Sequence, residues 1–173
     1  MIDINNYDIH LKPLQLEDIE LVRMWRNSKH VRSNMIYTKI ISSQQQLSWF
    51  EGLNSNQHYY IITTKDIKIG LIDVKNIDWQ LKTGEAGIFI GDLQYTESPI
   101  ALNAILALMD HYFIELELTS LKAKVLKKNT TALFMNQKLG YQITHEDTTC
   151  FHLKVSPEDY KKATKKFRNV LSK

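Results

Sequence analysis

Three strand-like segments follow one another in the middle of the chain. They read HYYIITT at 58–64, IKIGLIDVKNI at 67–77 and GEAGIFIG at 84–91, and they hold many β-branched and aromatic residues. Only Lys65 and Asp66 separate the first two, and a two-residue connection between strands is typical of a β-hairpin. The centre of the fold is therefore predicted to be an antiparallel sheet.

The remaining segments alternate between helical and strand periodicity. We predict strands at 7–14, 121–126 and 150–155, and helices at 16–27, 41–53, 98–116, 129–140 and 156–171. The order β-α-α-β-β-β-α-β-α-β-α favours the α+β class, with one mixed, mostly antiparallel sheet and helices on both faces. We expect a single domain over residues 1–173, ending in an amphipathic helix at 156–171 with Tyr160, Ala163, Phe167 and Val170 on one face.

Several helix boundaries carry local signals. Ser42 or Ser43 is a candidate N-cap for the helix that Gly52 ends, and Ser98 followed by Pro99 predicts the start of the next helix. The helix at 129–140 is expected to end at Gly140 and to turn Leu133 and Phe134 inward.

Composition excludes several classes of protein. A net charge of +3 argues against a dedicated nucleic-acid binder, and no apolar run approaches the length of about 18 residues that a membrane helix needs. Cys150 is the only cysteine, so no internal disulfide is expected. The N-terminal residues do not form a signal peptide, and the expected location is cytoplasmic. Cys150 and His152 share a strand face, but no second pair with zinc spacing accompanies them, so we predict no metal.

Two stretches resemble a known family. VRMWRNSKHVRSNMIYTKIISSQQQLSWFEGL at 22–53 and NTTALFMNQKLGY at 129–141 are similar to corresponding parts of the GNAT N-acetyltransferases. The resemblance is nearest to the branch that holds the amino-sugar acetyltransferases of pseudaminic-acid synthesis and the ribosomal-protein N-terminal acetyltransferases, and it covers roughly residues 8 to 155. It implies a splayed GNAT-like sheet that binds acetyl-CoA, as co-substrate, between the strands at 84–91 and 121–126.

The resemblance also implies where acetyl-CoA is held. The arm of acetyl-CoA would pair with backbone amides between Gly87 and Gly91, and its pyrophosphate would lie at the start of the next helix. The cofactor-binding candidates are Phe89, Ile90, Gly91, Ser98, Ile100, Ala101, Asn129 and Asn136. The loop DLQYTESP at 92–99 departs from the family because it lacks the glycines and arginine of the usual pyrophosphate loop, and Asp92 and Glu97 bring negative charge. Either the loop is only a capping turn, or acetyl-CoA binds there with weaker phosphate contacts.

Three residues are candidates for the chemistry. Glu85 is a candidate base, with a surface carboxylate as the alternative. Asn136 stands where many family members place a tyrosine that protonates the leaving thiolate, and Tyr141 is a substitute donor or else a core residue. The candidate acceptor-binding residues are Arg26, Asn27, Arg32 and Tyr37, since a guanidinium suits a phosphate or carboxylate of the acceptor.

The resemblance therefore implies an N-acetyltransferase that moves an acetyl group from acetyl-CoA to a primary amine. The acceptor would be a small molecule or a peptide, either a nucleotide-linked amino sugar or a protein N-terminus. The alternative is a catalytically impaired GNAT-fold module that binds a ligand or partner. A homodimer through the last helix is a further possibility.

Overall fold

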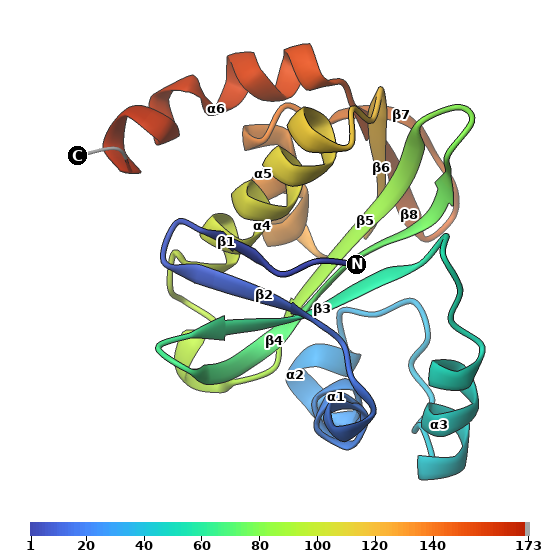
Figure 1. Ribbon diagram of the computed structural model, residues 1–173. Coiled ribbons are helices and arrows are strands. Elements are labelled where there is room, and N and C mark those ends of the chain that lie inside the picture. Colours follow the sequence, from blue (N-terminus) through green and yellow to red (C-terminus); the bar gives the residue numbers. More distant parts are fainter. Residues whose placement is uncertain (172–173) are drawn as a thin grey trace.

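A computed structural model describes residues 1–171, and the side chains up to Lys165. Within that part of the chain eight strands form one sheet in the order β1-β2-β3-β4-β5-β6-β8-β7 (Figure 1). The strands are β1 (Ile4–Asn6), β2 (Ile9–Pro13), β3 (His58–Thr64), β4 (Ile67–Asp78), β5 (Thr83–Ile90), β6 (Ser120–Leu126), β7 (Gln142–Glu146) and β8 (Cys150–Val155). Only the β5–β6 pairing is parallel, so the predicted mixed, mostly antiparallel sheet is confirmed.

The predicted hairpin joins β3 and β4. Lys65 and Asp66 both have positive φ angles, 46° and 63°, as a two-residue hairpin turn requires. The register places Tyr59 opposite Asp73 and Ile61 opposite Leu71. Directly opposed residues share one face of a sheet, so this register decides which polar side chains of the two strands gather together.

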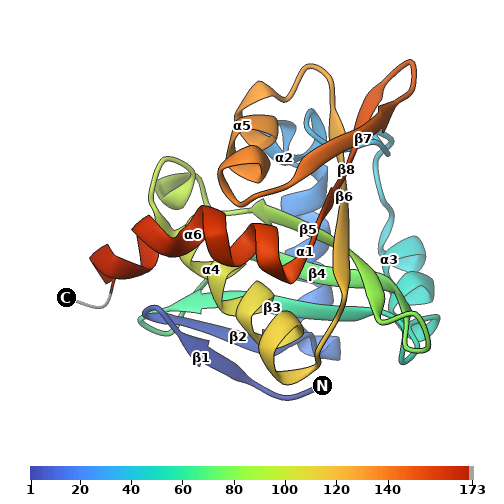
Figure 2. The same ribbon diagram turned by 90° about the horizontal axis from the view of Figure 1, so that it is seen from above.

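Helices cover both faces of the sheet. On one face, α1 (Ile19–Asn27), α2 (Lys29–Arg32) and α3 (Ser43–Glu51) lie together, and a small apolar cluster holds Val22 and Trp49 against β3 and β4. On the other face lie α4 (Ile100–Asp110), α5 (Thr130–Lys138) and α6 (Pro157–Leu171), as Figure 2 shows. The larger core cluster is on this second face, where the buried side chains of α4 pack on the sheet.

The predicted boundaries of two helices are confirmed in detail. Ser42 is the N-cap of α3, with its hydroxyl accepting from Gln45 N–H, and Gly52 is the C-cap. At α5 the Asn129 side chain accepts from Ala132 N–H, and Gly140 follows the helix with φ of 92°, a conformation that glycine adopts without strain.

Other expectations differ from the structure. Helix α4 begins at Ile100 with Pro99 as N-cap and no side-chain cap hydrogen bond, while the Ser98 hydroxyl donates to Tyr95 O. Phe134 was predicted to turn inward, but it is 61% exposed and lies under the Lys138 ammonium at 5.0 Å, while Leu133 packs against the core. Strands β1 and β7 and helix α2 were not predicted, since each is short and β7 has no buried residue. The predicted C-terminal helix is confirmed as α6, and it buries Tyr160. The side chains of Phe167 and Val170 lie outside the described residues.

Candidate active site

Strands β5 and β6 separate part-way along their length. Their parallel pairing runs only from Thr83 opposite Ser120 to Glu85 opposite Lys122. Beyond Lys122, β6 continues to Leu126 while pairing with β8 on its other side. The second half of β5 is therefore unpaired on the side facing β6, and the sheet opens into the gap that the GNAT resemblance implies.

The register shows which backbone groups face this gap. Gly91 N–H donates to Ile69 O, so Gly91 and Ile69 form a hydrogen-bonded antiparallel pair. Such pairs alternate with non-bonded pairs along the ladder, which makes Phe89 and Gly87 bond to β4 as well. Ile88 and Ile90 consequently turn their N–H and C=O groups the other way, toward β6. The β5 edge can thus pair with an extended molecule.

A cavity of about 590 Å³ occupies the gap and continues over the face of the sheet that carries α1 and α3. One part is lined by β5, β6, α4 and α5, including Ala86, Ile88, Val125, Ile105, Met109, Asn129, Ala132 and Asn136. The other part is lined by α1, α3, strand β3 and the segment between α2 and α3, including Arg26, Asn34, Met35, Tyr37, Gln46, Trp49 and Tyr59. The two parts meet beside Gly87, so two different molecules can approach each other there.

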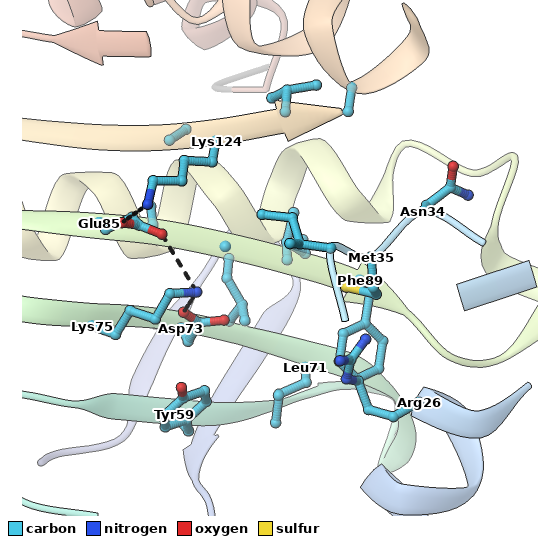
Figure 3. Close-up of a pocket in the computed structure, with 18 of the residues that line it drawn as sticks. Arg26, Asn34, Met35, Tyr59, Leu71, Asp73, Lys75, Glu85, Phe89 and Lys124 are labelled. Atoms are coloured by element: carbon cyan, nitrogen blue, oxygen red, sulfur yellow. Dashed lines mark hydrogen bonds and ion pairs between the residues drawn. The ribbon is translucent and has the colours of Figure 1, made fainter. Parts of the chain in front are cut away.

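Charged side chains form a network on the floor of the second part (Figure 3). Lys75 Nζ lies 3.5 Å from an Asp73 carboxylate oxygen and 3.7 Å from Glu85, and Lys124 Nζ lies 4.0 Å from Glu85. Burial raises the pKa of the Asp73 carboxyl, and Lys75 opposes that shift without cancelling it. Burial also lowers the pKa of Lys75, but Asp73, Tyr59 and Glu85 outweigh it and the net shift is upward.

Arg26 brings an incompletely satisfied cation to the same part of the cavity. Its Nη1 atom is buried and has no hydrogen-bond partner among the described residues. Burial lowers the pKa of this guanidinium and Asp73 opposes the shift, but an arginine remains charged at any physiological pH. A buried, unpaired N–H is costly, and an anionic group of a bound molecule would satisfy it.

The end of β5 does not present its glycine to a ligand. The Gly91 N–H donates to Ile69 O, and its carbonyl oxygen lies 3.1 Å from His30 Nε2. A Cβ on Gly91 would lie 2.2 Å from the Trp25 ring, so the glycine makes room for that indole. Phe89 lines the cavity but packs its ring edge-on to Trp25. At this end of β5, the backbone N–H and C=O groups that face the gap belong to Ile90.

The first turn of α4 offers free donors. Ile100 and Ala101 lie at the start of the helix, where backbone N–H groups have no intrahelical partner, and the helix dipole favours an anion. The Ser98 hydroxyl donates to Tyr95 O, which leaves its lone pairs but not its proton for a ligand. These three predicted residues lie at the α4 start and do not line the cavity itself.

The acidic residues of the 92–99 loop have different surroundings. Asp92 accepts from Gln94 N–H at 2.9 Å, so its charge is engaged in capping the 3-10 turn Leu93–Tyr95. Glu97 is exposed. The Asp92 carboxylate is therefore held against its own turn.

On the α5 side, three predicted residues line the cavity together. Asn129 caps α5 with its side-chain oxygen. Asn136 donates from its side-chain amide to Ala132 O at 2.8 Å, and this hydrogen bond does not use the Asn136 side-chain oxygen. Tyr141 is buried, and burial raises the pKa of its hydroxyl, so the phenol is protonated at neutral pH. The structure thus brings Asn136 and Tyr141 to the same cavity as Glu85.

The four candidate acceptor-binding residues separate into two groups. Arg26 and Tyr37 line the cavity. Asn27 does not, because its side-chain amide donates to Ile41 O and accepts from Ile41 N–H, both at 2.8 Å, and so holds the segment before α3. Arg32 lies outside the cavity, in a separate open hollow with Lys29 and Lys39.

Asp73 and Lys75 were not among the predicted site residues. A signal for them exists in the sequence, since an acid and a base two positions apart interrupt an otherwise apolar strand, and a strand turns alternate residues to one face. What the sequence did not reveal is which residues lie opposite them, namely Tyr59, Glu85 and Gly87.

Among the described residues, no group of three or more His, Cys, Asp or Glu side chains could hold a metal ion. None of the described helices combines the length and hydrophobicity that crossing a bilayer requires. His111 is a core residue with its Nδ1 2.7 Å from the Glu115 carboxylate.

The splayed sheet and its cleft are those of the GNAT fold, and comparisons with solved structures agree. FdhC, described as a nucleotide-linked sugar GNAT in its apo form, superimposes with a TM-score of 0.82 at 19% identity over 98% of each chain. The acetyl-coenzyme A complex of Campylobacter jejuni N-acetyltransferase PseH gives a TM-score of 0.67 at 24% identity, covering 86% of this chain and 99% of that one. At these identities the likeness concerns the fold.

The chain belongs to the GNAT acetyltransferase family, because the family model for the acetyltransferase (GNAT) domain matches residues 8–142. A curated relative, acetyltransferase PseH of Campylobacter jejuni, is 29% identical over 163 residues, which cover 93% of this chain and 98% of the relative. The chain is an acyl-CoA-dependent N-acetyltransferase with acetyl-CoA as its co-substrate. The alternative of a non-catalytic binding module is not favoured.

Proposed function

We propose that the chain transfers the acetyl group of acetyl-CoA to the primary amine of a nucleotide-linked amino sugar. The observation that carries this proposal is Arg26, a cavity-lining guanidinium whose Nη1 has no partner among the described residues. A phosphate of the acceptor satisfies a guanidinium with charge-assisted hydrogen bonds, whereas a protein N-terminus brings no such anion. The names of the relatives, a PseH acetyltransferase and a nucleotide-linked sugar GNAT, support the same acceptor class.

In this proposal acetyl-CoA uses the part of the cavity between β5 and β6. The N–H groups of Ile100 and Ala101, at the start of α4, bind the pyrophosphate, with Ser98 beside them. Asn129, the N-cap of α5, contributes to the cavity wall. Ile90 and Ile88 pair with the arm of acetyl-CoA. Because the phosphate end is at the α4 start, the thioester points to the closed end of the gap, where Ile88 N–H is positioned to hold its oxygen.

The acceptor then uses the second part of the cavity. Arg26 binds its anionic group, and Tyr37 covers it from the segment between α2 and α3. Asn27 supports that segment through Ile41, and Arg32 in the neighbouring hollow serves a more distant part of the acceptor. On the leaving-group side, Tyr141 donates a proton to the thiolate and Asn136 hydrogen-bonds the arm. Glu85 is a candidate base in the same cavity.

The test compares three acceptors at equal concentration with acetyl-CoA and the purified chain: a nucleotide-linked amino sugar, the same amino sugar without its nucleotide, and a short peptide with a free N-terminus. Mass spectrometry should detect one added acetyl group on the nucleotide-linked sugar, with a kcat/KM at least about tenfold above that of the free sugar. Preferential acetylation of the peptide would refute the acceptor class. The cytoplasmic location, the single domain over residues 1–173 and the homodimer stay predictions.

A further inference from the structure

Two carboxylates, Asp73 and Glu85, face the acceptor part of the cavity, and their surroundings differ. Glu85 is flanked by two ammonium groups, Lys75 at 3.7 Å and Lys124 at 4.0 Å, and by the Asn76 amide at 3.5 Å. These contacts tie the Glu85 carboxylate to side chains on both neighbouring strands, so its oxygens serve to anchor the two lysines.

Asp73 has the opposite surroundings. Its residue is only 8% exposed, and among the described residues its carboxylate has one ion-pair contact, with Lys75 at 3.5 Å. Burial raises the pKa of this carboxyl, which makes its anion a stronger base than an ordinary carboxylate. A buried carboxylate with few partners that faces the reacting groups is a candidate proton acceptor.

The register brings Asp73 to the point where the two parts of the cavity meet. Asp73 lies directly opposite Gly87 on the neighbouring strand, and Gly87 precedes Ile88, whose N–H faces the gap. A Cβ on Gly87 would lie only 2.9 Å from Asp73 Oδ1. The missing side chain leaves the carboxylate uncovered toward the position of the thioester.

We propose that Asp73 is the proton acceptor of the transfer reaction, acting on the acceptor amine across the opening that Gly87 provides. This inference rests on the acetyltransferase activity, but not on which amine is the natural acceptor.

Protons and electrons are conserved in the proposed step. Asp73 takes one proton from the bound ammonium, and the electron pair of the broken N–H bond remains on nitrogen. That pair forms the C–N bond to the thioester carbon, the C–S bond breaks, and its electrons leave with sulfur. Tyr141, which lines the cavity, gives its hydroxyl proton to the thiolate, and the second proton of the attacking nitrogen then restores that hydroxyl. Asp73 then releases its proton to water, so one proton appears per amide formed.

The charged and titratable groups facing Asp73 come from four elements. They are Arg26 from α1, Tyr59 from β3, Lys75 from β4 itself and Glu85 from β5. Arg26 and Lys75 favour the anion, while Glu85 favours the protonated acid. Since Tyr59 has its pKa raised by burial, it stays neutral in the range where a carboxyl titrates. The acid side of the pH profile should therefore report a carboxyl, Asp73 or Glu85, and variants of the two residues tell them apart.

The experiment compares Asp73→Asn with Glu85→Gln in kcat/KM–pH profiles, using any primary amine that the wild type acetylates. D73N should lower kcat by about 10²–10⁴-fold and remove the acid limb that Asp73 produces. E85Q should lower kcat less, through the loss of a partner for Lys75, and should keep that limb. An unchanged limb in D73N, or the larger loss in E85Q, would overturn the proposal.

A second pair of variants tests the geometry without removing the charge. Gly87→Ala places a Cβ against Asp73 Oδ1 and should lower kcat by at least about tenfold while the KM for acetyl-CoA changes little. The matched control is Gly52→Ala, because a Cβ there meets its nearest neighbour at 3.4 Å and the residue lies at the end of α3. Wild-type kcat in G87A would contradict the proposed opening.

Two controls separate failure of this inference from other causes. Acetyl-CoA should raise the melting temperature of D73N and G87A as it does that of the wild type, which shows that both are folded and bind the co-substrate. If the wild type acetylates a polyamine or a peptide but no nucleotide-linked sugar, the proposed acceptor is wrong, and the Asp73 test proceeds unchanged on the amine that reacts.

Discussion

Replacing Arg26 by methionine should weaken acceptor binding without destabilising the protein. The guanidinium lines the cavity with a buried Nη1 that lacks a partner. A hydrogen bond to a charged group contributes about 1.5–3 kcal/mol, so its loss should raise the acceptor KM by about 10–150-fold. The KM for acetyl-CoA should stay the same, because Arg26 lies in the part of the cavity over the sheet face and not between β5 and β6.

The effect of R26M on stability has a different sign from that of an ordinary core substitution. The variant removes a buried unsatisfied N–H, which costs the folded wild type about 1–3 kcal/mol, and it also removes an attraction to Asp73. Methionine keeps the length of the side chain and fills irregular space well. We therefore expect a melting temperature equal to or above that of the wild type, with each kcal/mol shifting it by about 2–4 °C in a chain of this size.

The matched control is Arg23→Met, one turn earlier in α1. Arg23 is already satisfied, since it pairs with Glu20 and donates to Ile41 O at 3.1 Å. R23M should lower the melting temperature slightly and keep the acceptor KM within about threefold of wild type, because Asn27 still holds Ile41. Steady-state kinetics and thermal unfolding measure both effects. If R26M destabilises the protein as a core truncation does, or leaves the acceptor KM unchanged, the assignment of Arg26 to an anion of the acceptor is refuted.

Three further predictions concern other parts of the structure. Tyr141→Phe should lower kcat by about 10–10²-fold in steady-state assays while leaving the melting temperature nearly unchanged, and an unaltered kcat would exclude Tyr141 as the proton donor. Gly91→Ala should destabilise the protein by about 1–3 kcal/mol or more in denaturant unfolding, because its Cβ would meet the Trp25 ring; wild-type stability would show that the indole can move away. The Asp147 carboxylate has its pKa lowered by His152 and by the Thr149 and Cys150 amides, so the stability it contributes is present above the unfolded pKa of about 3.9 and is lost as the pH falls through the lower folded value. Thermal unfolding of Asp147→Asn against pH should therefore diverge from wild type at neutral pH and converge with it in acid, and parallel curves would contradict this.

Local patterns were sufficient for most of the secondary structure. The hairpin at Lys65 and Asp66, the Ser42 cap and the glycine after α5 are each encoded by a few neighbouring residues, so the sequence alone predicted them. The same local reasoning failed for β7, whose residues are all exposed and carry no alternating pattern, and for Phe134, whose place was decided by where α5 lies on the molecule. Ser98 was predicted as a cap, but the helix begins one residue later, with Pro99 as N-cap, and the Ser98 hydroxyl donates to Tyr95 O in its own loop.

Some of the predicted site residues line the cavity, and others do not. The resemblance named Glu85, Asn136, Tyr141 and Arg26, and all four line one cavity. It also named Gly91 and Asn27, whose polar groups are already bonded within the protein, to Ile69 and Ile41 respectively. Neighbours in the sequence did not indicate those bonds, because their partners are 22 and 14 positions away.

The sequence by itself determined the kind of elements, their order and the family, since helical and strand periodicity and capping act within a few residues of the chain. Only the tertiary structure decided that β5 leaves β6 after Glu85 and that Asp73 faces Gly87. Strand register depends on the packing of a whole face at once, because a shift of one residue would turn every side chain to the opposite side. That register, and no local motif, places a buried carboxylate beside the open edge of the sheet.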